Sequence, residues 1–158
     1  MGAFDNLGRF CESQAIAADA TASTNTIDLV NVIPQLGVGA NAPFLNIRTA
    51  VAPTAVSNDT LAIEVQVDST VAFGSPKVVF MPLIGVALAE VNQSDARLAT
   101  AGAWIYRGQL PYGINERHMR LVFRNGTSVG VFTIDAWLSG PPDSDRGNEV
   151  LVSNVSNP

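Results

Sequence analysis

The side chains best suited to nucleophilic catalysis are scarce in this sequence, which has one histidine, His118, and one cysteine, Cys11. A catalytic triad or a Cys–His pair needs a histidine that hydrogen bonds hold on both sides. His118 stands between Arg117 and Arg120 on the outward face of an expected strand, with no acid beside it. Glu12 follows Cys11 and would make the thiol less nucleophilic. We therefore expect His118 at a surface or interface, and Cys11 to act as a small apolar side chain.

Paired carboxylates are the second possible chemistry, since glycosidases also use β-sandwich folds. Glu64, Asp68 and Asp135 are expected on outward strand faces, where they could approach one another across a sheet. Nothing in the sequence separates them from ordinary solvated acids, so a hydrolase is the least favoured function class. One Cys and one His cannot form a four-ligand zinc site alone, and the acidic segment 143–149 lacks the helices of a calcium loop. The sequence predicts no enzyme, no metal and no cofactor.

Composition limits the partners that the chain can have. Its 158 residues suit one domain with a real core. The net charge is −5 and no basic run is present, so neither nucleic acid nor an anionic membrane is an expected partner. Charged residues make up only 15%, against roughly 25% in an average domain, as expected if partners cover the surface or if Ser, Thr, Asn and Gly form it. A single cysteine and no signal-like or membrane-spanning run predict a soluble protein that folds in a reducing cytoplasm.

Strands must position these side chains, because helical periodicity is scarce and only residues 13–22 could form a short helical turn or an extended arm. Residues 61–68 alternate strictly between apolar and polar, which is typical of a half-buried strand. Residues 118–124 alternate in the same way, and the Asn-Gly pair at 125–126 predicts a hairpin leading to a return strand at 129–138. About eight such strands predict an all-β, jelly-roll-like antiparallel β-sandwich.

The ends of the chain differ from its middle. We expect residues 25–139 to form the sandwich, residues 1–24 an N-terminal arm, and residues 140–158 a C-terminal tail that begins with a Pro-Pro break. Either end could dock on a neighbouring subunit, for example by adding a strand to its sheet, or it could pack on its own domain. The apolar residues that would anchor such arms are Phe4, Leu7, Phe10, Ile16, Leu151 and Val152.

One outward strand face is unusually apolar. Trp137 and Val131 lie opposite Phe132 and Ile134 on the return strand, and tryptophan is enriched at interface hot spots. A mixed aromatic and arginine face suits contact with another protein, unless a loop or arm of the same chain covers it. The residues predicted for this interface are Trp137 and Val131, together with Arg117, His118, Arg120 and Arg124 on the strand before.

The segments Ser13-Gln14-Ala15 and Ser23-Thr24-Asn25-Thr26-Ile27-Asp28-Leu29 resemble the N-terminal signature of the capsid cement (decoration) proteins of tailed bacteriophages. The segment that carries this motif, residues 11–29, is 19 of the 158 residues. The resemblance implies a jelly-roll protein on the outer surface of an icosahedral head, made in the host cytoplasm. Such a protein would form a dimer or trimer on a local symmetry axis and clamp neighbouring capsomers of the major capsid protein.

A carbohydrate-binding module of a phage appendage is the alternative function. Trp104, Tyr106 and Tyr112 would then form a stacking platform for sugar rings. The competing interpretation places Trp104 and Tyr106, which share one strand face in a regular strand, in the core of the domain.

Overall fold

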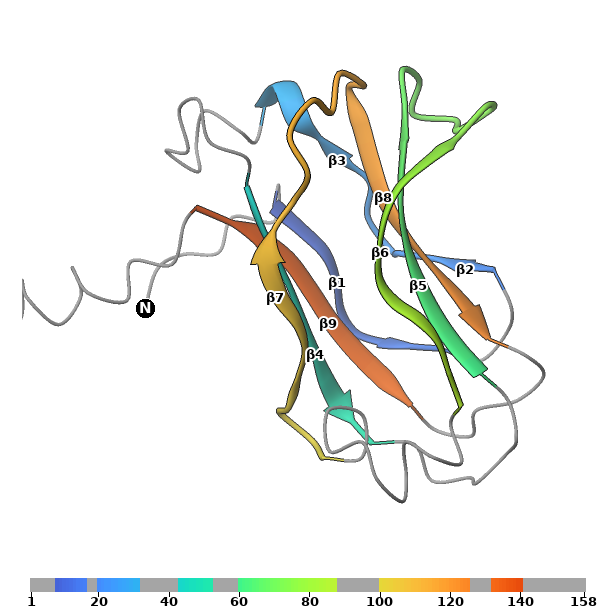
Figure 1. Ribbon diagram of the computed structural model, residues 1–158, viewed down its shortest axis with the longest axis vertical. Coiled ribbons are helices and arrows are strands. Elements are labelled where there is room, and N and C mark those ends of the chain that lie inside the picture. The colour runs from blue at the N-terminus through green and yellow to red at the C-terminus, as the bar shows by residue number, and fades with distance from the viewer. Residues whose placement is uncertain are drawn as a thin grey trace, which may run out of the picture.

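The chain folds as a two-layer, all-β sandwich (Figure 1), which confirms the predicted antiparallel β-sandwich. In this computed structural model, the residues that the structure describes are 8–16, 20–31, 43–52, 60–87, 100–125 and 132–140. They form nine β-strands and one helical turn at residues 29–31. Within these ranges, no helix has the length and apolar character that crossing a bilayer requires.

The first layer is a four-stranded antiparallel sheet in the order β1-β9-β4-β7. Its strands are β1 (Arg9–Ala15), β9 (Thr133–Ser139), β4 (Phe44–Val51) and β7 (Trp104–Gln109). The last described strand, β9, therefore lies between the first strand and β4.

The second layer is a five-stranded antiparallel sheet in the order β2-β8-β5-β6, with β3 also paired to β8. Its strands are β2 (Thr21–Ala22), β3 (Ile27–Asp28), β8 (His118–Asn125), β5 (Thr60–Asp68) and β6 (Lys77–Ala87). The chain crosses between the two layers after β1, β3, β4, β6, β7 and β8.

The core lies between the layers and follows the alternation of the strands. On β5, the side chains of Leu61, Ile63, Val65 and Val67 are at most 1% exposed, as predicted. Met119, Leu121 and Phe123 on β8 are fully buried on the same inner face. The four-stranded sheet contributes Phe10, Ile16, Leu45, Ile47, Ile134 and Ala136, all of them fully buried.

The N-terminal segment is a strand of this sandwich over residues 9–15, where we expected an arm. Phe10 and Ile16, predicted as interface anchors, lie in the core of their own domain and are 0% exposed. The period-two pattern is hidden because β1 contains two register shifts against β9, between Arg9 and Cys11 and between Cys11 and Gln14. Such bulges place an extra residue in one strand and reset the alternation.

The hairpin predicted at Asn125-Gly126 is wrong, because β8 and β9 belong to different sheets. Asn125 ends β8 opposite Leu61 of β5, whereas β9 pairs with β1 and β4. An Asn-Gly pair is a local turn signal, and it does not decide which sheet the next strand joins. That choice depends on strands far away in the sequence, from Val51 opposite Thr133 to Arg9 opposite Trp137.

The Ser-Gln-Ala and Ser-Thr-Asn segments join the two sheets along one edge. The Gln14 side chain donates from Nε2 to the Ala22 carbonyl at 2.7 Å, and its Oε1 accepts from the Thr24 amide at 2.8 Å. The Asn25 amide donates to the Phe10 carbonyl at 2.8 Å. Ser23 Oγ accepts from the Leu121 amide at 3.1 Å. These motif residues therefore hold β1 against β2 and β8.

Candidate functional site

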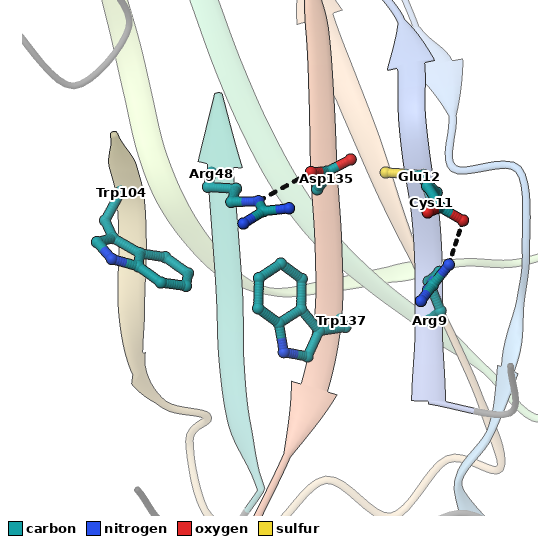
Figure 2. Close-up of a pocket in the computed structure, with 7 residues that line it drawn as sticks. All are labelled: Arg9, Cys11, Glu12, Arg48, Trp104, Asp135 and Trp137. Carbon is teal, nitrogen blue, oxygen red and sulfur yellow. Dashed lines mark hydrogen bonds and ion pairs between the residues drawn. The ribbon is translucent and has the colours of Figure 1, made fainter. Parts of the chain in front are cut away.

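The candidate site is a shallow pocket on the outer face of the four-stranded sheet (Figure 2). On β9, Ile134 and Ala136 point into the core, so the alternation directs Asp135 and Trp137 outward. The register places Asp135 opposite Arg48 of β4. The pocket has a volume of about 300 Å³ and is lined by Arg9, Cys11, Glu12, Arg48, Trp104, Asp135 and Trp137.

A bulge in β7 brings Trp104 to this face. Ile47 pairs with Tyr106 and Arg48 pairs with Trp104, so Ile105 is an extra residue in β7. Trp104 consequently points outward and is 40% exposed, while Ile105 is buried and Tyr106 packs against the core. Trp104 and Tyr106 therefore lie on opposite faces, contrary to the expectation that they share one. A stacking platform made of Trp104, Tyr106 and Tyr112 is not assembled.

Four outward side chains form a group that we call the Trp–Arg cluster: Arg48, Trp104, Arg107 and Trp137. The two indole rings are tilted by 58° with centroids 5.6 Å apart. The Arg107 guanidinium lies 5.2 Å from the Trp104 ring centroid, and the Arg48 guanidinium lies 5.5 Å from that of Trp137. Each arginine is thus at the distance at which a cation is attracted to the ring face.

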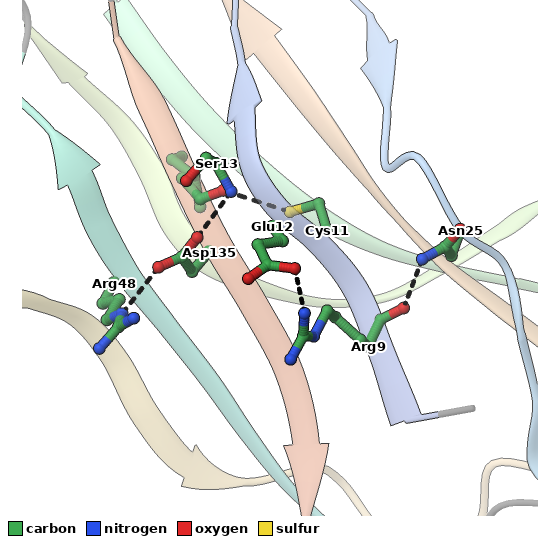
Figure 3. Close-up of polar contacts among 8 residues, drawn as sticks. Arg9, Cys11, Glu12, Ser13, Asn25, Arg48 and Asp135 are labelled. Carbon is green, nitrogen blue, oxygen red and sulfur yellow. Dashed lines mark hydrogen bonds and ion pairs between the residues drawn. The ribbon is translucent and has the colours of Figure 1, made fainter. Parts of the chain in front are cut away.

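Asp135 holds Arg48 in place beside the indoles (Figure 3). Its Oδ2 accepts from Arg48 Nε at 2.8 Å, and its Oδ1 accepts from the Ser13 amide at 2.6 Å. Ser13 has a φ of +46° at the second bulge of β1, which brings its amide to the carboxylate. Because both oxygens are engaged and the residue is only 8% exposed, Asp135 serves to position Arg48.

The predicted carboxylate pair is not assembled. Asp135 lies on the four-stranded sheet, whereas Glu64 and Asp68 lie on β5 of the other sheet. Asp68 lies four positions after Glu64 on the same strand. This places the two residues about 13 Å apart, which exceeds the spacing of glycosidase carboxylates. Glu64 also accepts hydrogen bonds from Gln66 and Arg124, at 2.9 and 3.2 Å.

Cys11 forms part of the pocket wall as a protonated thiol. The residue is 1% exposed, and burial together with the negative charge of Asp135 raises the pKa of the thiol to about 12. Its Sγ donates to the Ile134 carbonyl at 3.5 Å. These surroundings support the interpretation of Cys11 as a small apolar side chain, since the thiolate is the reactive form.

The predicted interface residues Arg117, His118, Arg120 and Arg124 lie on the outer face of the five-stranded sheet, away from Trp137. The single patch predicted from sequence is therefore divided between two opposite faces. The reason is the crossover between β8 and β9, which sends these strands to different layers.

Each arginine of this second face has a partner in the same sheet. Arg117 forms an ion pair with Asp28 at 2.7 Å, and this contact lowers the pKa of the Asp28 carboxyl. Arg124 pairs with Glu64. Arg120 donates to Gln66 Oε1 at 2.9 Å and lies 4.2 Å from the Phe73 ring centroid.

His118 has acids beside it that the sequence order did not show. It stands opposite Asp28 of β3 and Asp68 of β5 in the sheet register. The Asp28 carboxylate binds Arg117, and the Asp68 carboxylate accepts from the Thr70 and Ser75 amides, each at 2.9 Å.

Some predicted residues lie outside the described ranges: Phe4, Leu7, Val131, Leu151 and Val152. Sequence reasoning found Trp137, but it did not connect Trp137 with Arg48, Trp104 or Arg107. These residues meet only through the pairing of β4 with β7 and β9. Their one sequence signal is the outward phase of Arg48 on an apolar strand.

The described residues contain no group of three or more His, Cys, Asp or Glu side chains that could hold a metal ion. No family model matches the sequence, and no curated protein matches it closely enough to count as a relative. The geometry of the site is that of two indole rings grouped with arginine side chains on the outer face of a sheet.

Proposed function

We propose that this chain is a virion structural protein, a cement protein that binds the outer surface of an icosahedral phage head and stabilises contacts between capsomers of the major capsid protein. The observation that carries the proposal is the Trp–Arg cluster, an outward pair of tryptophans with an arginine at each ring. Tryptophan and arginine are the residue types most enriched at interface hot spots. The resemblance of the Ser13–Ala15 and Ser23–Leu29 segments to the cement-protein signature supplies the identity of the partner.

The strand order supports the jelly-roll part of this proposal. If β2 and β3 count as one interrupted strand along β8, the described residues form eight strands in two four-membered layers. Its repeated crossing between the layers agrees with the two Greek keys of a jelly roll. The family signature agrees with this fold, because Gln14, Ser23 and Asn25 make the hydrogen bonds that close the edge of the sandwich.

The role of the site in binding rather than catalysis is supported by its acids. The Asp135 carboxylate is occupied by Arg48 and the Ser13 amide, and Glu12 forms an ion pair with Arg9. Neither acid is placed opposite a second free carboxylate in the pocket. The mechanism we propose is therefore thermodynamic. A ligand that binds only the assembled lattice stabilises it by about 2.7 kcal/mol per site when its free concentration is about a hundred times Kd.

The direct test uses heads of the parent phage assembled without this protein. We expect the purified protein to bind these heads at saturable sites as a dimer or trimer, and to raise the temperature at which the heads rupture. Cryo-electron microscopy of the decorated heads would show added external density between capsomers. Absence of binding to mature heads, with the protein folded, would contradict the proposal.

The size of the pocket raises a second candidate function, a carbohydrate-binding module. Its volume of about 300 Å³ suits a single sugar ring, and it combines two indoles with charged groups able to bind hydroxyls. A glycan panel tests this function. Binding to one glycan class with no binding to heads would favour it over the cement role.

A further inference from the structure

We infer that the Trp–Arg cluster receives a carboxylate from an acidic segment of the partner protein. The inference rests on the proposed function and adds the chemistry of the partner surface: Asp or Glu side chains on the shell, presented to Arg107 and Arg48 beside the two indoles.

The charges around the pocket are unbalanced in the positive sense. Three arginines, Arg9, Arg48 and Arg107, face two acids, Glu12 and Asp135. Arg9 is paired with Glu12 and Arg48 with Asp135. Arg107 is exposed and forms no ion pair within the described part of the chain. A protein with a net charge of −5 thus carries a local cationic excess on this one face.

The guanidinium groups of Arg48 and Arg107 are placed to bind an anion. Arg48 donates to Asp135 through Nε. No described residue accepts a hydrogen bond from the two Nη groups of Arg48. The Arg48 side chain is 46% exposed despite this ion pair. A guanidinium edge matches the two oxygens of a carboxylate, and such charge-assisted pairs are about twice as strong as neutral hydrogen bonds. The neighbouring indoles would exclude water from the pair and strengthen it further.

The outer face of the five-stranded sheet provides a comparison within the same molecule, because its arginines have partners inside the domain. There, Arg117 pairs with Asp28 and Arg124 with Glu64, while Arg120 is only partly exposed, donates to Gln66 and lies over the Phe73 ring. Cations that are already neutralised gain little from an incoming acid. Charge complementarity therefore selects the four-stranded sheet for the acidic partner.

The same geometry disfavours a sugar. A pyranose ring stacks on an open aromatic face, but each indole here has a guanidinium at one ring face and the other indole 5.6 Å away. An acidic side chain approaching from solvent needs only the outer edge of the arginines. The arrangement consequently favours an acidic protein segment over a neutral glycan.

The chain provides its own reporter for this site, because Trp104 and Trp137 are its two tryptophans. Intrinsic tryptophan fluorescence therefore responds to binding at the cluster. We propose titrating the full chain with a short Asp/Glu peptide, its Asn/Gln counterpart, a peptide of residues 141–158, and a neutral oligosaccharide. Saturable fluorescence change with the Asp/Glu peptide alone is the expected result. A response to the oligosaccharide alone, or an equal response to the Asn/Gln peptide, would overturn the inference.

Saturation by the 141–158 peptide alone would also overturn it, since the occupant would then be the tail of another copy of this chain. A matched pair of variants makes the test sharper. Arg107→Gln and Lys77→Gln each remove one positive charge from an exposed side chain, Arg107 on β7 of the four-stranded sheet and Lys77 on β6 of the five-stranded sheet. We expect Arg107→Gln to weaken binding to heads about tenfold and to reduce its salt dependence, while Lys77→Gln changes neither.

The outcomes separate this inference from the proposed function. If both variants bind heads with the affinity and salt dependence of the unmodified protein, the cement role stands and the acidic partner is refuted. If neither the protein nor its variants bind heads at all, the proposed function has failed. Thermal unfolding of both variants confirms that they fold.

Discussion

At the scale of single residues, the Asp68 side chain has a structural role. Its carboxylate accepts hydrogen bonds from the Thr70 and Ser75 amides, both at 2.9 Å, and so closes the turn that follows β5. These backbone donors favour the ionised form and hold the pKa of Asp68 below its usual value. The pKa of Asp28 is lowered in the same direction, chiefly by its hydrogen bond from Arg117.

These two acids predict a loss of stability in acid. Their pKa values are lower in the folded state than in the unfolded state, so the stabilisation is complete above the unfolded value, about pH 4, and is lost as the pH falls through the folded values. Urea unfolding between about pH 6 and pH 2.5 should show a falling free energy of unfolding. The Asp68→Asn variant should show a shallower fall. An identical pH dependence in the variant would contradict this role.

The Cys11 thiol should be unreactive in the folded protein. With a pKa of about 12, about one thiol in 100,000 is ionised at pH 7, and the side chain is buried. We expect the folded protein to react with a disulfide reagent such as DTNB only as fast as it unfolds. The urea-unfolded chain should react at once, and serves as the control. Rapid reaction of the folded protein would show that the N-terminal strand opens readily.

At the scale of elements, the contribution of β1 to stability tests whether the N-terminal segment packs on its own domain. Phe10 is fully buried between the sheets. Phe10→Ala should therefore destabilise the isolated protein by about 3–5 kcal/mol, because it removes a large core side chain and leaves a cavity. Chemical denaturation at low protein concentration measures this effect.

The exposed Val78 on β6 provides the control for this prediction. Its side chain is half exposed at 50%, so Val78→Ala should change the free energy of unfolding by less than about 0.5 kcal/mol. If Phe10→Ala were as mild as Val78→Ala in the isolated protein, residues 9–15 would be an arm that packs elsewhere. A large effect seen only in an oligomer would lead to the same conclusion.

The faces of the regular strands β5 and β8 were predictable from sequence, and those of the bulged strands β1 and β7 were not. β5 and β8 keep an unbroken period of two, so their inner and outer faces follow directly from the residues. β1 contains two register shifts and β7 contains one, and each shift moves the following side chains to the other face. Sequence alternation alone therefore assigned Trp104 and Tyr106 to one face and left β1 unrecognised.

The candidate site was predictable only in part, for a related reason. Trp137 stands out as a tryptophan on the outward side of a strand. Arg48 and Trp104 join it through long-range pairing around β4, which local patterns do not encode. The predicted partnership with the arginines of β8 failed because the Asn-Gly signal describes a turn and not a choice of layer.

At the scale of the whole molecule, the two outer faces differ in kind. On the five-stranded sheet, Arg117 and Arg124 are paired with acids and Arg120 with Gln66 and Phe73, whereas the four-stranded sheet carries the Trp–Arg cluster. The molecule should consequently bind its partner with one face only.

Two exposed aromatic residues test this one-sidedness. Trp104 is 40% exposed within the cluster, and Tyr112 is 69% exposed beyond the end of β7. Trp104→Ala should weaken binding to heads about thirtyfold, as expected for a hot-spot residue, with only a small change in thermal stability. Tyr112→Ala should leave binding unchanged. Equal losses from both variants, measured by co-sedimentation with heads, would argue against the cluster as the contact.

The central position of β9 in its sheet has a consequence for synthesis of the protein. Residues 133–139 are inserted between β1 and β4, so the four-stranded layer has a gap until nearly the whole sandwich has left the ribosome. Pairing of such distant segments is slow compared with local contacts. During translation β1 and β4 therefore present unpaired edges, and closure of the layer must await β9. A nascent chain that stalls before residue 132 should accordingly remain protease-sensitive, while release of the completed chain should make it resistant.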